Sequence, residues 1–371
     1  MSTGKDLALS ASALAHAPIL PTANATTEVE SRYVVVLKQS VGKAAVVAHM
    51  QRANLVLSTQ NAKAFEIGAL KGYSVQATAE GVRRLAESDE IEYIEPDQTF
   101  HLTPNPTFTG ATPQHAKRDV QTAAPCNLAR ISHRRPGGTD YVYERTGGTW
   151  VYVLDTGVKV THVKFEGRAI WGFSAVGGVP DDQNGHGTYV AGVASSQTYG
   201  VARFAGVVGV KVLGGDGSGT TWGIIAGINW AVQDMRTRGS VGKATAVLAV
   251  GGAYSVALNN AVAAASNAGL FFAVAAGSSN TDNVGSSPGS EPSVCTVGAT
   301  TIDDVRLPSS NHGAGTAAAH IAGLGAYSLA LEGPRGAVAL CERLREVATR
   351  DALSGIPSGT PNLLAYNLSG L

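Results

Sequence analysis

The sequence predicts an α/β protein with a doubly wound parallel sheet, preceded by a small α+β domain of the split-βαβ kind. Two observations support this prediction. From about Leu128 onward, continuous apolar strands alternate with helical segments, which is typical of a parallel sheet covered by helices on both faces. Between residues 32 and 100, shorter strands are interleaved with two amphipathic helices, and the last of these strands alternates apolar and polar residues.

The chain divides into four expected parts. These are a signal or disordered tail at 1–30, a small domain at 31–101, a linker at 102–125 and a large domain at 126–371. The linker is rich in Pro, Thr and Ala and contains the basic pair Lys117-Arg118. Such composition indicates an exposed segment that proteases can reach, and an ordinary linker without processing is the alternative.

The small domain is expected to follow the order β-α-β-β-α-β, an open-faced sheet with two helices on one side. Its expected strands are 32–37, 65–67, 72–77 and 91–95, and its expected helices are 43–57 and 80–87.

The large domain is expected to repeat strand and helix. Its expected strands are 151–154, 207–213, 246–250, 270–276 and 293–299, and its expected helices are 188–196, 219–235, 255–268 and 318–332. In such sheets the active crevice lies at the carboxyl ends of the strands, and Asp155 and the segment after Ala276 both lie at such ends.

Composition excludes several classes of function. The 371 residues carry 28 basic and 28 acidic side chains, and Lys and Arg form no cluster that would attract a nucleic acid. No apolar run reaches the ~18 residues of a membrane-spanning helix. We therefore expect neither a nucleic-acid partner nor a membrane partner, and we expect a monomer.

The N-terminus and the cysteines leave alternatives open. Residues 7–15 resemble a short signal-peptide core with a small-residue cleavage site, although Asp6 beside Lys5 weakens the pattern, and a disordered tail is the alternative. Cys126, Cys295 and Cys341 are too few for a disulfide scaffold and fit no zinc spacing. One bridge with one free thiol, and three separate buried thiols, are both compatible with the sequence.

Asp155 and His186 carry the strongest chemical signal. Asp155 ends the apolar run Trp150-Val-Tyr-Val-Leu-Asp155, and His186 lies in the Gly-rich turn Asn184-Gly-His-Gly-Thr188 before a small-residue helix. A serine nucleophile needs a base, and the base needs a carboxylate that fixes its tautomer and stabilises its cation. An Asp at a strand end and a His at the start of the next helix can supply that pair.

Longer motifs make the chain resemble a subtilisin-family serine protease of the proteinase K branch. They are Val153-Leu-Asp-Thr-Gly-Val158, Asn184-Gly-His-Gly-Thr188, Gly217-Ser-Gly-Thr-Thr221, Ala275-Ala-Gly277 and Pro292-Ser-Val-Cys-Thr-Val-Gly-Ala-Thr300. The resemblance implies a subtilisin-like fold, secretion or vacuolar targeting, and a peptide or protein substrate. It also implies that the small domain is an inhibitory propeptide, which would make the chain a zymogen and the propeptide its own partner.

The resemblance also assigns roles to residues. Asp155 matches the orienting carboxylate and His186 the general base. The substrate cleft has one wall at Ala275, Ala276 and Gly277 and another at Ala249, Val250, Gly251 and Gly252. Cys295 and Cys341 match a bridged pair, and the carbonyls of Pro292 and Val294 match part of a calcium site.

Departures from the family pattern cluster around the expected active site. The family's Gly-Thr-Ser reads Gly315-Thr316-Ala317, so the nucleophile is missing and Ala317 is its nearest match. Only six residues, 314–319, stand where the resemblance implies a segment several times longer, so the domain is truncated near 313–320. Ser309 and Ser310 lie on the wrong side of this deletion.

Three further positions differ from the family. Ser278 replaces the oxyanion-hole Asn, whose loss typically lowers turnover ~10²–10³-fold. Ala249 replaces a cleft-wall serine, and Tyr189 replaces a histidine one turn along from His186. Losses on both sides of one active site indicate relaxed selection on catalysis.

The sequence therefore predicts a serine endopeptidase by descent that is inactive or severely impaired as written. Alternatives are a pseudoprotease that binds peptides or inhibits a relative, an active protease whose transcript contains the missing segment, and an unstable product. We expect no cofactor, and weak or lost calcium binding, because the carboxylate ligand disappears with the deletion. We also expect residues 305–320 to be strained or poorly ordered.

Overall fold

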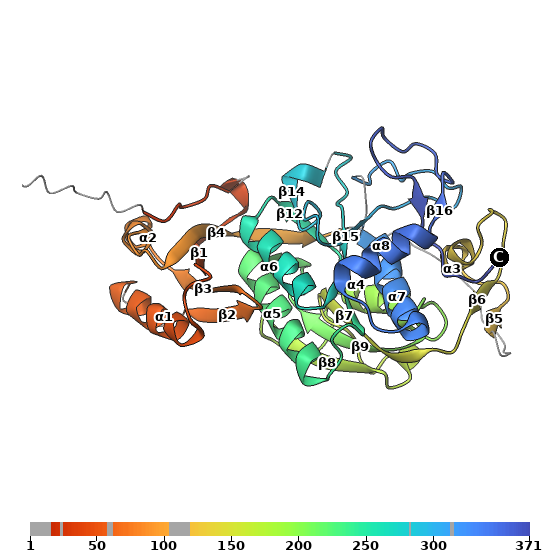
Figure 1. The fold of residues 1–371 in the computed structure, drawn as a ribbon, viewed down its shortest axis with the longest axis horizontal. Helices are drawn as coiled ribbons and strands as arrows, with labels where there is room; N and C mark the ends of the chain where they lie inside the picture. Colours follow the sequence, from red (N-terminus) through yellow and green to blue (C-terminus); the bar gives the residue numbers. More distant parts are fainter. Residues whose placement is uncertain (1–15, 23–24, 58–61, 104–118, 282, 312–314) are drawn as a thin grey trace, which may run out of the picture.

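The computed structural model describes residues 16–22, 25–57, 62–103, 119–281, 283–311 and 315–371 (Figure 1). It contains a small N-terminal domain, drawn in red and orange, that lies beside a large α/β domain. Both predicted domains are present with the predicted fold classes. Within the described residues, no helix is both long and apolar enough to span a membrane.

The small domain has the predicted β-α-β-β-α-β order. Its elements are β1 (Glu28–Leu37), α1 (Lys43–Leu57), β2 (Lys63–Ile67), β3 (Leu70–Gln76), α2 (Ala79–Ala86) and β4 (Ile91–Leu102), after a short 3-10 turn η1 (Ala25–Thr27). The strands pair antiparallel in the order β2-β3-β1-β4. Val46 of α1 and Val82 and Leu85 of α2 join one buried cluster with Val35 of β1, so both helices cover the same face of the sheet.

The open face of this sheet packs on α5 (Thr221–Thr237) and α6 (Val256–Asn267) of the large domain. Phe65 on β2 contacts Trp222 on α5, with ring centroids 6.0 Å apart. The Tyr93 hydroxyl on β4 accepts a hydrogen bond from Asn260 on α6 at 2.8 Å. The small domain is therefore seated on two helices of the large domain, as Figure 1 shows.

The large domain is built on a six-stranded parallel sheet. In spatial order its strands are β15 (Cys295–Val297), β13 (Phe271–Ala275), β11 (Ala244–Leu248), β7 (Gly147–Asp155), β9 (Phe204–Lys211) and β8 (Ala169–Ser174).

Helices cover both faces of this sheet. Val151 and Val153 of β7 belong to the cluster formed with α4 (His186–Ser195) and α7 (Gly315–Glu332). Tyr152 and Leu154, which point to the opposite face, belong to the cluster formed with α5 and α6. The predicted doubly wound arrangement is confirmed.

The remaining elements surround this core. They are β5 (Asp119–Gln121), α3 (Cys126–Ser132), β6 (Tyr141–Tyr143), η2 (Val163–Phe165), β10 (Ser218–Thr220), β12 (Val250–Ala253), η3 (Asn283–Gly285), β14 (Ser286–Ser287), α8 (Ala337–Val347), β16 (Thr349–Arg350) and β17 (Leu363–Leu364).

Several element bounds differ from the prediction. The last strand of the small domain was expected at 91–95, but β4 extends to Leu102, because residues 99–102 pair with β10 and β12 of the other domain. The expected strand 246–250 is two strands, β11 and β12, and β12 pairs with β4 and β14 outside the parallel sheet. The expected linker also contains a strand, β5, which pairs with β6.

Candidate active site

Asp155 and His186 meet in a buried pair at the carboxyl edge of the sheet. Asp155 is the last residue of β7 and His186 the first residue of α4. Nδ1 of His186 lies 2.8 and 2.9 Å from the two carboxylate oxygens of Asp155. Burial lowers the pKa of His186, but the hydrogen bond and charge of Asp155 outweigh burial, so the pKa is raised above its usual value. The geometry is that of a base oriented by a carboxylate.

The Asp182 carboxylate connects the chain segments that carry Asp155 and His186. It accepts hydrogen bonds from the Thr156 hydroxyl (2.7 Å), which directly follows Asp155 in the chain. It also accepts from the backbone N–H groups of Gly185 (2.9 Å) and Thr188 (2.8 Å), at the start of α4. These hydrogen bonds outweigh burial and lower the pKa of Asp182, so it is a carboxylate at neutral pH. Sequence analysis missed this residue; its signal is an acidic side chain at a helix N-terminus.

The end of β4 lies between β10 and β12 and continues to His186. Its residues pair antiparallel with β10 on one side, where Phe100 lies opposite Gly219, and with β12 on the other, where Leu102 lies opposite Val250. The predicted cleft wall at residues 249–252 is therefore occupied by a strand of the same chain. This is how an extended peptide adds to exposed sheet edges.

Thr103 brings the strand to the Asp155–His186 pair. Its N–H and hydroxyl both donate to the carbonyl of Ala249, at 3.3 and 2.9 Å. Its own carbonyl oxygen lies 3.2 Å from Nε2 of His186. Within the described part of the chain, the hydrogen-bond partner of Nε2 is thus a peptide carbonyl of the same chain.

Phe100 anchors the same strand in the apolar interior. It is fully buried and belongs to the same apolar cluster as Leu213 and Val250. A Cβ atom added to Gly252 would lie 2.5 Å from the Phe100 ring, so the glycine in β12 makes room for this ring. Together the two residues define an apolar subsite.

The other predicted wall, residues 275–277, lies at the carboxyl end of β13. Asn311 is buried against it: its Nδ2 donates to the Ala276 carbonyl at 3.0 Å, and its Oδ1 accepts from the N–H of Ser279 at 2.7 Å. Half-buried Ser278 lies between Ala276 and Ser279, the two residues that are hydrogen-bonded to Asn311. This places the predicted oxyanion-hole position beside the residues that precede the expected deletion.

The region around Ala317, where the nucleophile was expected to be missing, is described only in part. Residues 312–314, part of the segment expected to be strained, lie outside the described residues. Ala317 is in the first turn of α7. Ser310 is fully buried, and its hydroxyl donates to the carbonyl of Asn311 at 2.6 Å.

Two carboxylates of β4 that sequence analysis missed join the domains. Glu95 accepts a hydrogen bond from the N–H of Ala257 in the first turn of α6, and Asp97 accepts one from Trp222 in the first turn of α5, both at 2.9 Å. Burial raises the pKa of both carboxyls, although the helix N–H groups oppose this shift. Two acidic residues two positions apart on one strand share a face, and this spacing is the signal that could have revealed them.

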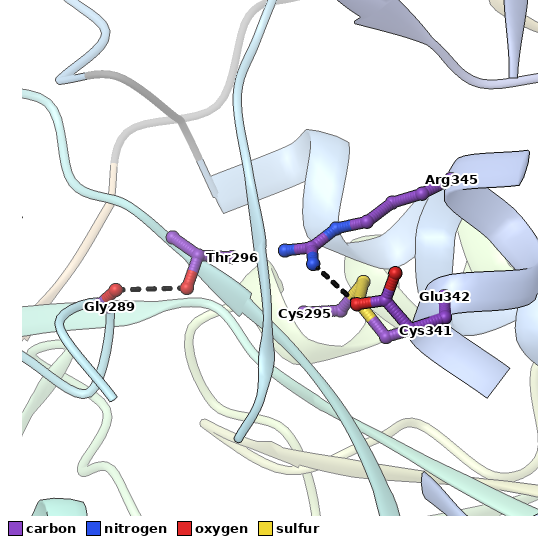
Figure 2. Close-up of a disulfide and its surroundings, with 6 residues drawn as sticks. All are labelled: Gly289, Cys295, Thr296, Cys341, Glu342 and Arg345. Carbon is purple, nitrogen blue, oxygen red and sulfur yellow. Dashed lines mark hydrogen bonds and ion pairs between the residues drawn. A yellow bond between two sulfur atoms is a disulfide. The ribbon is translucent and has the colours of Figure 1, made fainter. Parts of the chain in front are cut away.

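A disulfide joins Cys295 on β15 to Cys341 on α8, with the two Cα atoms 5.6 Å apart (Figure 2). Cys126 is a free, half-buried thiol. This is the pairing that the family resemblance implies.

Comparisons with known proteins agree with this architecture. Residues 146–342 match the subtilase family, and residues 32–103 match the peptidase inhibitor I9 family. A cuticle-degrading protease from Metarhizium anisopliae is 38% identical, with 93% of this chain and 92% of the relative aligned. The subtilisin-like serine protease AsES from Sarocladium strictum is 41% identical, with 81% of each chain aligned.

A solved structure agrees with the match to the subtilase family. The crystal structure of a cold-adapted subtilisin-like serine proteinase aligns with a TM-score of 0.63 and 35% identity, covering 67% of this chain and 99% of the other. Together with the Asp155–His186 pair, these matches establish that the chain belongs to the subtilase family of subtilisin-like serine proteases and carries an N-terminal I9 inhibitor domain.

Proposed function

We propose that this chain binds extended peptides in the cleft between β10 and β12 and does not form an acyl-enzyme. The observation that carries the proposal is the strand at residues 99–103, which pairs with both walls and presents the Thr103 carbonyl to His186. A peptide recognised in this way is held by main-chain hydrogen bonds, and its specificity comes from side-chain subsites such as the one that Phe100 fills.

The sequence supports the proposed absence of acyl-enzyme chemistry. Alanine stands at 317, where the family's pattern has serine, and an alanine side chain has no nucleophile. Ser310 is buried and bonded to the backbone. Ser278 and Ala249 further alter the groups that would contact a reacting carbonyl.

An active-site probe and a peptide test the two halves of the proposal separately. The full chain is treated with a fluorophosphonate, and the intact mass is measured; we expect no covalent adduct, and a stoichiometric adduct would refute the loss of nucleophilic chemistry. Because β4 fills the cleft, binding is measured on the Phe100→Ala variant with a labelled peptide of sequence Gln98–Thr103. We expect binding, and much weaker binding of the same peptide with Asp in place of its Phe. Failure of both peptides to bind a folded variant would refute the binding role.

A second candidate is an active protease translated from a longer transcript. The retained Asp155–His186 geometry favours it, because selection would not preserve a hydrogen-bonded pair that has no use in catalysis. Sequencing the transcript across the codons for Asn311 to His320 decides the matter. An inserted segment with Gly-Thr-Ser supports activity, and a transcript without an insertion supports the binding role.

A third candidate is inhibition of a catalytically active relative by residues 32–103. Their match to an inhibitor family and the placement of β4 in a protease cleft favour this role. Titration of an active subtilisin-like protease with this segment tests it: tight, stoichiometric inhibition is expected, and rapid degradation of the segment contradicts it.

Calcium is expected to bind weakly or not at all. A cavity of about 350 Å³ is lined by Pro292 and Val294, but also by the cationic Arg345, and Glu291 there accepts hydrogen bonds from Ser293. This set does not suit a hard cation that wants several oxygen ligands. The same Tm with calcium and with a chelator would support the expectation.

We also propose that the chain is a monomer and is secreted or vacuolar. The Cys295–Cys341 disulfide supports this location, because such bonds persist in oxidising compartments.

A further inference from the structure

His186 has hydrogen-bond acceptors on both sides of its ring. Nδ1 lies 2.8 and 2.9 Å from the carboxylate oxygens of Asp155, and Nε2 lies 3.2 Å from the carbonyl oxygen of Thr103. A carbonyl oxygen has no proton to donate, and neither has an ionised carboxylate. A neutral imidazole carries only one N–H, so it cannot satisfy both contacts.

We infer that His186 serves in this chain as a protonated anchor for a peptide carbonyl, so that occupation of the cleft is coupled to uptake of one proton by the Asp155–His186 pair. This inference rests on the proposed peptide-binding function and deepens it. The ligand is an extended peptide whose carbonyl takes the place of the Thr103 carbonyl.

Each neutral form of the pair would leave one contact repulsive. With hydrogen on Nδ1 alone, the lone pair of Nε2 faces the lone pairs of the Thr103 oxygen. With hydrogen on Nε2 alone, the lone pair of Nδ1 faces the Asp155 carboxylate. The second proton sits on the ring, because Asp155 Oδ1 also accepts a 2.7 Å hydrogen bond from the N–H of Thr156, which favours the ionised carboxylate.

The missing nucleophile explains why this chain differs from a protease with a full triad. A serine hydroxyl can donate its proton to Nε2, and a neutral histidine then suits the site. Here the contact to Nε2 comes from a carbonyl, which accepts only. The same histidine therefore changes from a base into a hydrogen-bond donor.

The charged groups around the ring favour this state. Asp155 on β7 and Asp182, which precedes α4, both favour the cation, and Thr103 at the end of β4 contributes a carbonyl dipole. Lys211 on β9 carries the opposing charge. Its ammonium group donates a hydrogen bond to the Thr156 carbonyl and interacts with the same two aspartates. The raised pKa of His186 agrees with the balance of these groups.

The coupling between occupation of the cleft and proton uptake has a defined sign and an upper limit. Below the pKa of the empty pair, His186 is already charged and occupation takes up no proton. Between that pKa and the higher pKa of the occupied pair, occupation weakens as pH rises, by at most about tenfold per pH unit for one proton. Above the pKa of the occupied pair, the anchor is lost.

The full chain with ¹⁵N-labelled histidine provides the test. Nitrogen chemical shifts are expected to show both ring nitrogens of His186 protonated at about pH 6 and a pKa above 6.5. The variant Phe100→Ala, which loosens the strand, is expected to lower that pKa. Hydrogen exchange of the Thr103 amide, corrected for its intrinsic pH dependence, measures occupation of the cleft.

His186→Gln is the matched control, because a glutamine amide can donate to the carbonyl but does not titrate. We expect protection of the Thr103 amide to fall with rising pH in the unsubstituted chain more steeply than in His186→Gln. Glu95 and Asp97 also titrate at the domain interface, but they contribute equally to the pH dependence of the unsubstituted chain and of His186→Gln. Equal slopes, or a neutral His186 under a protected strand, would overturn the inference and leave peptide binding standing. An unprotected Thr103 at every pH would instead overturn the proposed function itself.

Discussion

The carboxylate of Glu95 accepts a 2.9 Å hydrogen bond from the backbone N–H of Ala257, so a side chain of the inhibitor domain caps a helix of the peptidase domain. Ser255, the N-cap residue of α6, accepts from the N–H of Leu258 and leaves that of Ala257 to Glu95. Asp97 does the same for α5, where Thr220 accepts from Gly223. Helix N-termini favour anionic groups, so the carboxylates of Glu95 and Asp97 attach the inhibitor domain to α6 and α5.

Removal of one cap is expected to weaken the docking of the two domains. Glu95→Ala should lower the free energy of unfolding by about 1 kcal/mol, the usual contribution of a helix cap. Urea denaturation measures the change. Glu92→Ala is the matched control, since Glu92 is on the same strand but exposed. Equal effects of the two substitutions would contradict the capping role.

The contact between Phe100 and Gly252 is expected to be energetically coupled. Phe100→Ala should destabilise the chain by roughly 3–5 kcal/mol, because it empties a fully buried site. Gly252→Val should destabilise it by about 1–3 kcal/mol, because the new side chain meets the ring.

The double variant then tests the contact itself. With Phe100 already alanine, Gly252→Val should cost less than it does alone, since the clash is gone. Denaturation of all four proteins of the cycle gives the coupling. Simple additivity would show that β4 does not lie against β12 in solution.

The Cys295–Cys341 disulfide is expected to stabilise the segment between β15 and α8. It closes a loop with a sequence separation of 46, and replacing both cysteines with alanine should lower the free energy of unfolding by about 2–4 kcal/mol. Thermal unfolding with and without a reductant measures this. Cys126→Ala, which removes the free thiol, is expected to change little and to leave the effect of reductant intact.

His49 is expected to make the inhibitor domain sensitive to acid. The ring is buried, with Nδ1 3.2 Å from the Tyr73 hydroxyl and Nε2 3.1 Å from the Ser88 hydroxyl. Burial lowers its pKa, and the nearby Glu90 only partly opposes this. The folded domain therefore binds a proton less readily than the unfolded chain, and stability should fall as pH drops below about 6.5.

Urea midpoints of the full chain between about pH 8 and pH 5 measure this loss. His49→Gln keeps a side chain that can donate and accept hydrogen bonds but removes the titration, so the fall over that range should be smaller. The contribution of His186 has the opposite sign, because its pKa is raised and its stabilisation is present at low pH. An unchanged pH profile in His49→Gln would exclude His49 as the sensitive group.

The fold could be predicted from the sequence because its signals are local. The apolar run before Asp155 becomes β7, and the alternating pattern from Ile91 begins β4. Strand ends were less predictable: the alternation of polar and apolar residues over 99–102 is short and runs into the Pro-rich linker, and these residues form a strand by pairing with β10 and β12.

The sequence by itself determined the family and the Asp155–His186 pair, and it places alanine at 317, because these depend on residue type and spacing alone. Only the tertiary structure decided what contacts the pair. It placed the Thr103 carbonyl on Nε2, and the carboxylates of Glu95 and Asp97 on two helix N-termini. These contacts join residues more than 80 positions apart, which packing brings together and no local pattern records.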